Sequence, residues 1–362
     1  MVKLLIVDDS ALMRKCLSDI FKAEPGFELQ TARNGAEALS LAQSWNPDVI
    51  TLDVNMPEMD GITCLSEIMV KCPKPVVMVS SLTHEDAEVT LQALGLGAVD
   101  YVPKPDGTVS LHLDKIRAVL VAKVRAAAQV KLRLSKFLLK RVRHAATASP
   151  PPRRLPEPKP FRPLPLESPG TEPPGLILIG VSTGGPSTLE QILPLLPVTL
   201  PWPVVVAQHM PETFTGVFAR RMDGLSELRV CEASRPLPLC PGHIYIARGD
   251  ADMLITRRCG VLTALPTPAA ANYYWHPSVD RLVRSAMEHL PPQRLVAVQL
   301  TGMGDDGAEA IAKLHAEGGR TIAEAEETAV VWGMPGELVK RNGASVVLPV
   351  HKVAEQIRRW VS

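Results

Sequence analysis

The chain has 362 residues, which is enough for two domains, and its content of 46% hydrophobic and 21% charged residues is that of an ordinary globular protein. A net charge of +1 and 4% aromatic residues argue against a nucleic-acid partner or an anionic membrane surface. The six cysteines include no C-x-x-C pair, which favours reduced thiols over disulfides or a zinc site. The sequence shows no charged-then-apolar leader and no apolar run of membrane-spanning length, so we expect a cytoplasmic protein that is not inserted in a membrane.

The first third of the chain alternates strand and helix patterns, which predicts a parallel sheet with helices on both faces. Buried strands are expected at 3–7, 48–52, 75–79 and 99–102, and Ser10 can cap the helix that follows the first strand. Functional groups gather at the carboxyl ends of the strands in such a sheet. The polar side chains found at these ends are Asp8, Asp9, Asp53, Ser80 and Lys104.

These strand ends predict phosphoryl chemistry. Three carboxylates in one pocket repel one another unless a cation lies among them, and Mg²⁺ prefers a few carboxylates together with water and phosphate-type oxygens. A lysine and a serine hydroxyl nearby can pair with an incoming phosphoryl group. The set therefore predicts phosphoryl acceptance on a carboxylate with the help of a metal ion. The alternative for each residue alone is ordinary turn chemistry.

Residues 1–125 closely resemble the receiver domain of two-component response regulators, and the resemblance rests on Asp8-Asp9, Asp53-Val-Asn-Met-Pro57, Asp60-Gly61, Ser80 and Lys104-Pro105 in this order. It implies a flavodoxin-like, five-stranded parallel sheet with Asp53 as the phosphorylated residue. It also implies that Mg²⁺ is held by Asp8, Asp9, Asp53 and the backbone carbonyl of Asn55. Ser80 and Lys104 would then sense the phosphoryl group.

Residues 126–173 are expected to form a basic and then proline-rich linker. There is no Asp or Glu between Lys115 and Pro156, and the stretch 150–174 is crowded with prolines, which indicates a semi-rigid, extended segment. The basic run is either a solvated helix face or a patch for an acidic partner. DNA is a poor candidate because no helix-turn-helix pattern follows.

In the segment 174–362 the alternation of strands and helices resumes. The apolar run 176–179 leads into Gly180-Val-Ser-Thr-Gly184, a G-x-S-x-G pattern whose glycines permit a sharp turn that presents Ser182 as a candidate nucleophile. The alternative is a glycine-rich turn that only joins a strand to a helix. A helix is expected over 188–196, followed by a strand at 203–207 that leads to His209, a candidate general base.

A glycine-rich turn, Thr301-Gly-Met-Gly-Asp-Asp-Gly307, follows a strongly buried strand at 295–300. Between it and His209 we expect a strand at 242–247, a hairpin-like pair over 253–264 and a helix that ends at residue 289. A carboxylate of this turn can orient an imidazole, and its backbone N–H groups can form an oxyanion hole. A phosphate-binding loop is the rival interpretation, but neither turn has the lysine of a P-loop or a G-x-G-x-x-G pattern.

The order Ser, His, Asp differs from the Ser, Asp, His order of ordinary α/β-hydrolases. Instead the segment is similar to the catalytic domain of the chemotaxis protein-glutamate methylesterase (CheB) family, in Gly180-Val-Ser-Thr-Gly-Gly-Pro186, Ala207-Gln-His-Met-Pro211, Pro277-Ser-Val-Asp280, Leu300-Thr-Gly-Met-Gly-Asp-Asp-Gly307 and Val331-Trp-Gly-Met-Pro335. This resemblance implies a doubly wound, mostly parallel α/β domain. It implies a triad of Ser182, His209 and Asp306, an oxyanion hole at the backbone of Met303, and Thr183 beside the nucleophile.

The same resemblance implies a function for the whole chain. Members of the family hydrolyse glutamyl methyl esters on methyl-accepting chemoreceptors, and many deamidate receptor glutamines. We therefore expect a chemotaxis histidine kinase as phosphodonor, receptors as substrate and no cofactor in the esterase site. We also expect the unphosphorylated receiver to cover the catalytic cleft, so that phosphorylation of Asp53 frees Ser182.

The chain departs from the family pattern at a few positions. Arg248 and Asp252 stand where the family often has proline and histidine, and Trp332 replaces the usual phenylalanine. None of these positions belongs to the expected triad. Two other functions stay open on the sequence: a non-enzymatic response regulator whose second domain binds a partner or nucleotide, and a general esterase or amidase for small molecules.

Overall fold

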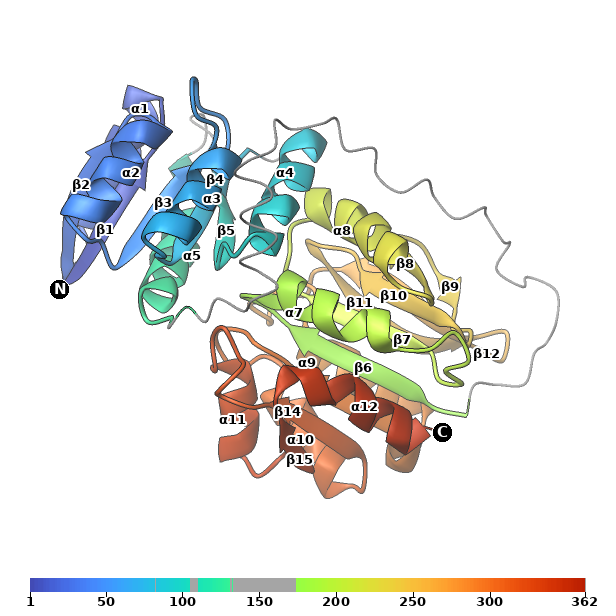
Figure 1. Cartoon of the computed structure of the whole chain (residues 1–362). Helices are drawn as coiled ribbons and strands as arrows, with labels where there is room; N and C mark the ends of the chain where they lie inside the picture. Colours follow the sequence, from blue (N-terminus) through green and yellow to red (C-terminus); the bar gives the residue numbers. More distant parts are fainter. Residues whose placement is uncertain (82, 105–109, 131, 133–173, 362) are drawn as a thin grey trace. The chain divides into compact units, whose positions relative to one another are not determined.

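The structure, a computed structural model, describes residues 1–81, 83–104, 110–130, 132 and 174–361 (Figure 1). The chain divides into two compact units, within residues 1–153 and 154–362, and each is described by itself. The proline-rich linker and nearly all of the basic run expected over 126–173 lie outside the described residues. The domain boundaries expected from the sequence, with a receiver over 1–125, a linker over 126–173 and a catalytic domain over 174–362, stay predictions.

The first unit contains a parallel sheet of five strands in the order β2-β1-β3-β4-β5. This sheet confirms the predicted flavodoxin-like fold. Its strands are β1 (Val2–Val7), β2 (Phe27–Ala32), β3 (Val49–Asp53), β4 (Val76–Ser80) and β5 (Asp100–Pro103). The helices found among its described residues are α1 (Ala11–Lys22), α2 (Gly35–Ser44), α3 (Gly61–Lys71), α4 (His84–Gly95) and α5 (Ser110–Ala128).

The second unit is built on a seven-stranded sheet in the order β15-β14-β13-β6-β7-β10-β8, in which every pair of neighbours is parallel. This arrangement confirms the predicted doubly wound α/β domain. The strands are β6 (Leu176–Val181), β7 (Val204–Gln208), β8 (Arg229–Ala233), β10 (His243–Ala247), β13 (Leu295–Gln299), β14 (Arg320–Glu324) and β15 (Val346–Leu348). The chain runs from β6 to β7 on one side and later returns to β13 on the other, so β6 lies at the switch point of the sheet.

The expected hairpin is present and longer than predicted. Strands β11 (Ala251–Arg258) and β12 (Val261–Pro268) pair antiparallel and form a small sheet with β9 (Leu237–Pro238). The helices of this unit are α7 (Gly185–Ile192), α8 (Glu212–Leu225), α9 (Val279–His289), α10 (Ala308–Ala316), α11 (Met334–Lys340) and α12 (Val350–Val361), with single 3₁₀ turns at Leu193–Leu195 and Pro292–Arg294.

Helix α7 begins at Gly185, three residues before the predicted start at 188. Pro186 occupies the first turn, where its missing N–H costs no hydrogen bond. Gly184 ends the preceding turn with φ of 78°, and a β-carbon there would lie 2.6 Å from the Val330 β-carbon. Both the backbone angle and the lack of space therefore require glycine at this position.

Alternate residues of the central strands face two different layers. Leu176 and Leu178 of β6 belong to a core made with α9, α10, α11 and the hairpin. Ile177 and Ile179 are also fully buried and face the opposite side of the sheet, where α7 and α12 pack together (Figure 1). The strands that carry the site are thus buried on both faces, which fixes the positions of their ends.

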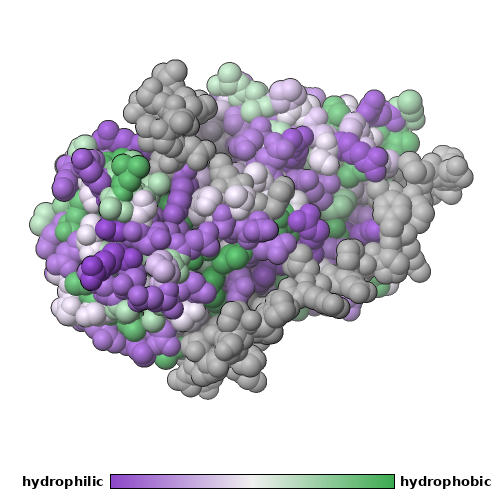
Figure 2. All heavy atoms as spheres, turned by 90° about the horizontal axis from the view of Figure 1, so that it is seen from above, coloured by the Kyte–Doolittle hydropathy of each residue, from purple (hydrophilic) through white to green (hydrophobic). Residues whose placement is uncertain are grey.

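The face of the molecule seen in Figure 2 is mostly hydrophilic, with hydrophobic residues scattered over it. Within the part of the chain that the structure describes, no helix has both the length and the apolar character needed to span a bilayer.

Candidate active sites

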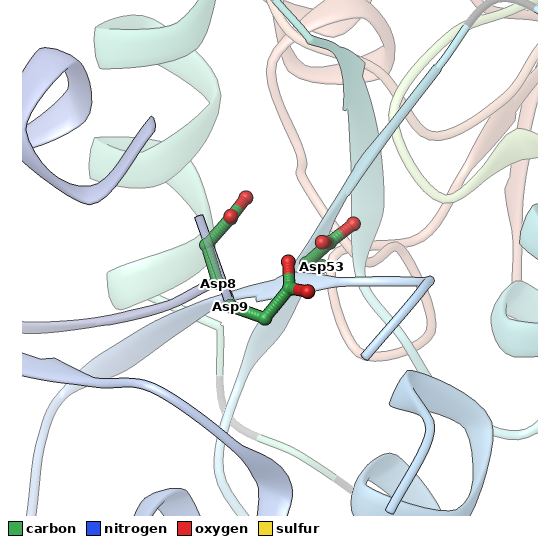
Figure 3. Close-up of side chains that lie close together, drawn as sticks. All are labelled: Asp8, Asp9 and Asp53. Carbon is green, nitrogen blue, oxygen red and sulfur yellow. The ribbon is translucent and has the colours of Figure 1, made fainter. Parts of the chain in front are cut away.

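The first site consists of three carboxylates at the ends of β1 and β3. Asp8, Asp9 and Asp53 each offer a carboxylate oxygen, and these oxygens lie within 4.8 Å of one another (Figure 3). Asp8 and Asp53 are buried, whereas Asp9 is exposed. Arg14 of α1 donates to the backbone carbonyls of Asp8 (2.8 Å) and Asp9 (2.9 Å) and so ties the end of β1 to the helix that follows it.

Lys104 lies directly against two of these carboxylates. Its ammonium nitrogen is 2.8 Å from Asp53 Oδ2 and 3.3 Å from Asp8 Oδ2. The pKa of Asp53 is raised to about 6, chiefly by burial and also by the neighbouring Asp8, while Lys104 opposes both effects. Burial lowers the pKa of Lys104, but its two carboxylate partners outweigh burial and raise it above the ordinary value. The lysine therefore stays charged and partly neutralises the cluster.

The remaining receiver residues lie close to this cluster. Ser80 is fully buried at the end of β4 and its backbone carbonyl accepts from the Lys104 N–H at 2.8 Å. The backbone N–H of Asn55 is 3.3 Å from Asp53 Oδ1, and its side-chain amide donates to Asp86 Oδ1 at 2.8 Å. Sequence reasoning did not single out Asp86. Burial raises the pKa of Asp86, but hydrogen bonds from Thr83 and Asn55 outweigh burial and lower it.

The donor set fits Mg²⁺. Among the described residues it is the one group of three acidic, histidine or cysteine side chains close enough to hold a metal ion. All three donors are hard carboxylate oxygens, and the exposed Asp9 leaves a side from which water and a phosphoryl oxygen can approach. The assignment of Asp8, Asp9, Asp53 and the Asn55 carbonyl as ligands stays a prediction.

The second site lies where three adjacent strands, β13, β6 and β7, end. The register pairs Val181 of β6 with Gln208 of β7, so the next residues, Ser182 and His209, follow neighbouring strand ends. On the other side, the Ser182 N–H donates to the carbonyl of Thr301, which follows β13, at 2.9 Å. Ser182 is thus held at the switch point of the sheet with its backbone fixed on both sides.

His209 and Asp306 form a hydrogen-bonded pair. The imidazole Nε2 lies 2.8 Å from Asp306 Oδ2, and both side chains are buried. The other ring nitrogen, Nδ1, is buried without a hydrogen-bond partner among the described residues. A carboxylate at Nε2 fixes the proton on that nitrogen and leaves Nδ1 as the basic one. The hydrogen bond from Ser182 to His209 stays a prediction.

Asp306 is held by more than the imidazole. Its carboxylate accepts from the backbone N–H groups of Val279 (2.7 Å) and Asp280 (3.1 Å) and from the Ser278 hydroxyl (3.0 Å), all at the start of α9. Burial raises its pKa, but the hydrogen bond from His209 and these donors outweigh burial and lower it. Its neighbour Asp305 is exposed and lies 3.6 Å from Arg341 instead.

Thr301 connects the nucleophile turn with the glycine-rich turn. Its hydroxyl donates to the carbonyl of Thr183 at 2.9 Å, and its N–H donates to Glu324 Oε2 at 2.8 Å. Glu324 is fully buried at the end of β14, and burial raises its pKa to about 7 against opposing hydrogen bonds from Thr301 and Thr328. Sequence reasoning missed this residue, although a carboxylate after a short buried strand is the signal that identified Asp53.

The two pocket residues expected from the sequence, Thr183 and Met303, both lie in the turns that surround Ser182. Thr183 is buried beside Ser182, and Met303 is half-buried in the turn after β13. Gly302 packs so closely on the nucleophile that a β-carbon there would lie 2.8 Å from that of Ser182. The oxyanion hole at the Met303 backbone stays a prediction.

The loop before α9 contributes one residue, Trp275, that contacts His209, and a second, His276, that anchors the loop. Trp275 stacks on the imidazole with 5.2 Å between ring centroids and 8° between planes. The neighbouring His276 is held by Asp252, 2.9 Å away, which also accepts from Arg281 at 2.5 Å. Burial raises the pKa of Asp252, but these partners lower it overall. Asp252, left open by the sequence, therefore supports the loop that carries Ser278.

Comparison with known proteins agrees with this architecture. Residues 177–357 match the model of the CheB methylesterase family, and residues 4–114 match that of the response regulator receiver domain. A Rhodospirillum rubrum protein named protein-glutamate methylesterase/protein-glutamine glutaminase 3 is 56% identical over 362 residues, covering 100% of this chain and 97% of the relative. A Rhodopseudomonas palustris protein named protein-glutamate methylesterase/protein-glutamine glutaminase 2 is 53% identical, covering 99% and 98%.

Among solved structures, the crystal structure of the Thermotoga maritima CheB methylesterase catalytic domain is 39% identical, with a TM-score of 0.50, and the match covers 52% of this chain and 98% of that one. The fold and the matches define a response regulator with an enzymatic output domain. The chain belongs to the CheB methylesterase family, which confirms the resemblance drawn from the sequence.

Proposed function

We propose that the chain hydrolyses glutamyl methyl esters on chemoreceptors and deamidates receptor glutamines, under the control of phosphorylation at Asp53. The single observation that carries the proposal is the His209–Asp306 pair on the strand ends next to Ser182, with the basic nitrogen of the imidazole left without a partner. The names of the relatives support the substrate class.

In the proposed reaction Ser182 Oγ attacks the ester carbonyl while His209 Nδ1 takes the hydroxyl proton. The tetrahedral intermediate places its negative oxygen toward the backbone of the 302–304 turn. Collapse breaks the bond to methoxide, which leaves as methanol with the proton from His209. Water then attacks the acyl-enzyme by the same proton path and releases the glutamate carboxylate. With a glutamine substrate the leaving group is ammonia.

In the receiver, a histidine kinase would supply the phosphoryl group to Asp53. Asp8, Asp9, Asp53 and the Asn55 carbonyl would hold Mg²⁺, which when bound neutralises charge on the phosphoryl oxygens. Lys104 already lies 2.8 Å from Asp53 and would pair with the new phosphoryl group, and Ser80 would hydrogen-bond it. We propose that the unphosphorylated receiver covers the catalytic cleft and that these new contacts release it. The cytoplasmic location expected from the sequence stays part of the proposal.

The test measures methanol release from methylated receptor, with and without a small-molecule phosphodonor and Mg²⁺. We expect Ser182→Ala to abolish methanol release and to leave Asp53 phosphorylation intact, and Asp53→Asn to keep the basal rate but lose its activation. Retained hydrolysis in Ser182→Ala would reject the nucleophile. Equal wild-type rates with and without phosphodonor would reject the regulation.

The same assay separates the alternative functions. A non-enzymatic regulator would release no methanol from any substrate. A general esterase would act on a small generic ester at least as well as on methylated receptor.

A further inference from the structure

We propose that Trp275 is a positioning residue for the reaction: its indole fixes the plane of the His209 imidazole and stabilises the imidazolium formed when Ser182 loses its proton. The inference rests on the function proposed above, in which His209 is the general base. Trp275 precedes α9 in a loop and matches none of the segments that carry the family resemblance.

The first observation is the stack itself. The two rings are nearly parallel, at 8°, and their centroids are 5.2 Å apart. The indole is in turn fixed from two sides. Tyr274 packs its ring edge-on at 4.8 Å, and Trp275 Nε1 lies close to Gly304, where a β-carbon would be 3.4 Å away. Trp275 therefore connects the base with the turn that carries Met303.

The second observation concerns what fixes the imidazole. Its hydrogen bond to Asp306 holds one point of the ring, Nε2, but a single hydrogen bond leaves the ring free to tilt about that point. The parallel indole removes this freedom, because tilting would break the stacked contact. The two contacts together determine where Nδ1 points, and a base must lie within hydrogen-bond reach of the proton that it takes.

The third consideration is electrostatic. The face of an indole attracts a cation, and the attraction is stronger in a site shielded from water. Around His209 the charged partner in direct contact is Asp306, with Asp280 next to it at the start of α9. Three ion pairs lie on the adjacent elements: Arg281 of α9 with Asp252 of β11, Glu212 of α8 with Arg248 after β10, and Asp305 with Arg341. Trp275 thus adds a second, uncharged contact that favours the protonated ring.

An alternative role for Trp275 is that of a platform that only contacts the substrate. The two roles differ in kinetics. A platform contributes equally to ground-state and transition-state binding, so its loss raises KM and leaves kcat unchanged. A residue that stabilises the imidazolium acts when that charge forms, so its loss lowers kcat.

The kinetic test uses the full chain with phosphodonor and a peptide that contains a glutamyl γ-methyl ester, and compares Trp275→Leu with Trp275→Phe. Leucine keeps apolar bulk without an aromatic face, whereas phenylalanine keeps the face. We expect Trp275→Leu to lower kcat about 3- to 30-fold with KM unchanged, and to move the acidic limb of kcat/KM against pH to lower pH by roughly 0.5 to 1.5 units. Trp275→Phe should keep most of the wild-type kcat and should leave the acidic limb close to its wild-type pH.

Trp360→Leu, which alters a tryptophan of α12, serves as the matched control and should change neither quantity. A rise in KM alone for Trp275→Leu, with kcat and the acidic limb unmoved, would overturn the proposal in favour of the platform.

A second readout needs no turnover. A protonated imidazole quenches the fluorescence of a stacked indole, so acidification should quench part of the emission of the full chain. This component should be absent from both Trp275→Phe and His209→Gln. An unchanged quench in His209→Gln would overturn the proposal. Because the titration is independent of catalysis, it tests the contact between the indole and the protonated imidazole separately from the reaction. A wild-type chain that released no methanol would instead reject the proposed function.

Discussion

The two sites of this chain are built alike and yet treat their carboxylates in opposite ways. Both collect polar side chains at the carboxyl ends of parallel strands. In the receiver, Asp8, Asp9 and Asp53 are crowded together, and burial with mutual repulsion raises the pKa of Asp53 to about 6. In the second unit, Asp306 accepts four hydrogen bonds and its pKa is lowered despite its burial.

The difference follows from what each carboxylate has to do. A phosphoacceptor site keeps negative charges close together and relies on cations, Lys104 and a metal ion, to hold them. An orienting carboxylate must stay ionised beside an imidazole, so hydrogen-bond donors surround it. Glu324 shows that a raised pKa is not by itself a mark of chemistry, since it lies behind the nucleophile turn and holds Thr301.

The largest effect is expected from Asp306→Asn. The amide no longer favours the tautomer with the proton on Nε2, nor does it stabilise the imidazolium, so kcat should fall about 10³- to 10⁴-fold. Methanol release from methylated receptor measures the loss. The matched control is Asp305→Asn, which changes an exposed carboxylate 3.6 Å from Arg341 and should keep wild-type kcat. Similar losses in both variants would contradict the assignment of Asp306.

Glu324→Gln should change the dependence of stability on pH. The pKa of Glu324 is raised from the ordinary 4.5 to about 7, so the folded state binds the extra proton between these values and the free energy of unfolding falls as pH rises through this window. A shift of this size corresponds to about 3 kcal/mol. Urea unfolding of the full chain should show the variant to be more stable than the wild type at pH 8, by up to that amount, and similar to it at pH 4.5. If the free energy of unfolding changed with pH in the same way in both proteins, Glu324 would not be the source of the pH dependence.

Lys104→Met should destabilise the receiver at neutral pH. It removes the cation between Asp8 and Asp53, and we expect a loss of about 2 kcal/mol, below the range for fully buried pairs because the lysine side chain is 20% exposed. The loss should shrink at pH 5, where Asp53, with a pKa of about 6, takes up a proton. Thermal unfolding of the full chain with and without Mg²⁺ measures it. A loss independent of pH would argue against the charge explanation.

The smallest effect compares two helix caps. Asp60 caps α3 by accepting from the Thr63 N–H at 2.7 Å, and Ser278 caps α9 by accepting from the Arg281 N–H at 3.3 Å. Alanine at either position should cost about 1 kcal/mol of stability. Ser278 also donates to Asp306, so Ser278→Ala should lower kcat as well, by about tenfold. Equal basal kcat values in the two variants would show that the serine acts only as a cap.

Much of both sites could be predicted because their residues follow recognisable strands. Asp8, Asp53, Ser182 and His209 each lie at or directly after the end of a buried strand, and parallel strands bring such positions to one edge of the sheet. Asp306 needed more than the pattern, since the sequence offers two adjacent aspartates. The family resemblance selected Asp306, and in the structure Asp306 is the one that contacts the imidazole.

The residues that sequence reasoning missed or left without a role owe their positions to packing between distant segments. Trp275 lies in a loop without periodicity, 66 positions after the histidine on which it stacks. Asp252 starts in a hairpin and reaches His276 across 24 positions. The start of α7 was misplaced because two glycines and a proline hide the helix pattern, although proline favours a first turn.

The base and its orienting carboxylate are separated by 97 positions, which include β8, the small antiparallel sheet and all of α9. The nucleophile and the base, by contrast, are fixed by a single strand pairing. The hairpin within the long intervening segment can therefore change in length or charge without altering the β6–β7 pairing that sets the nucleophile beside its base.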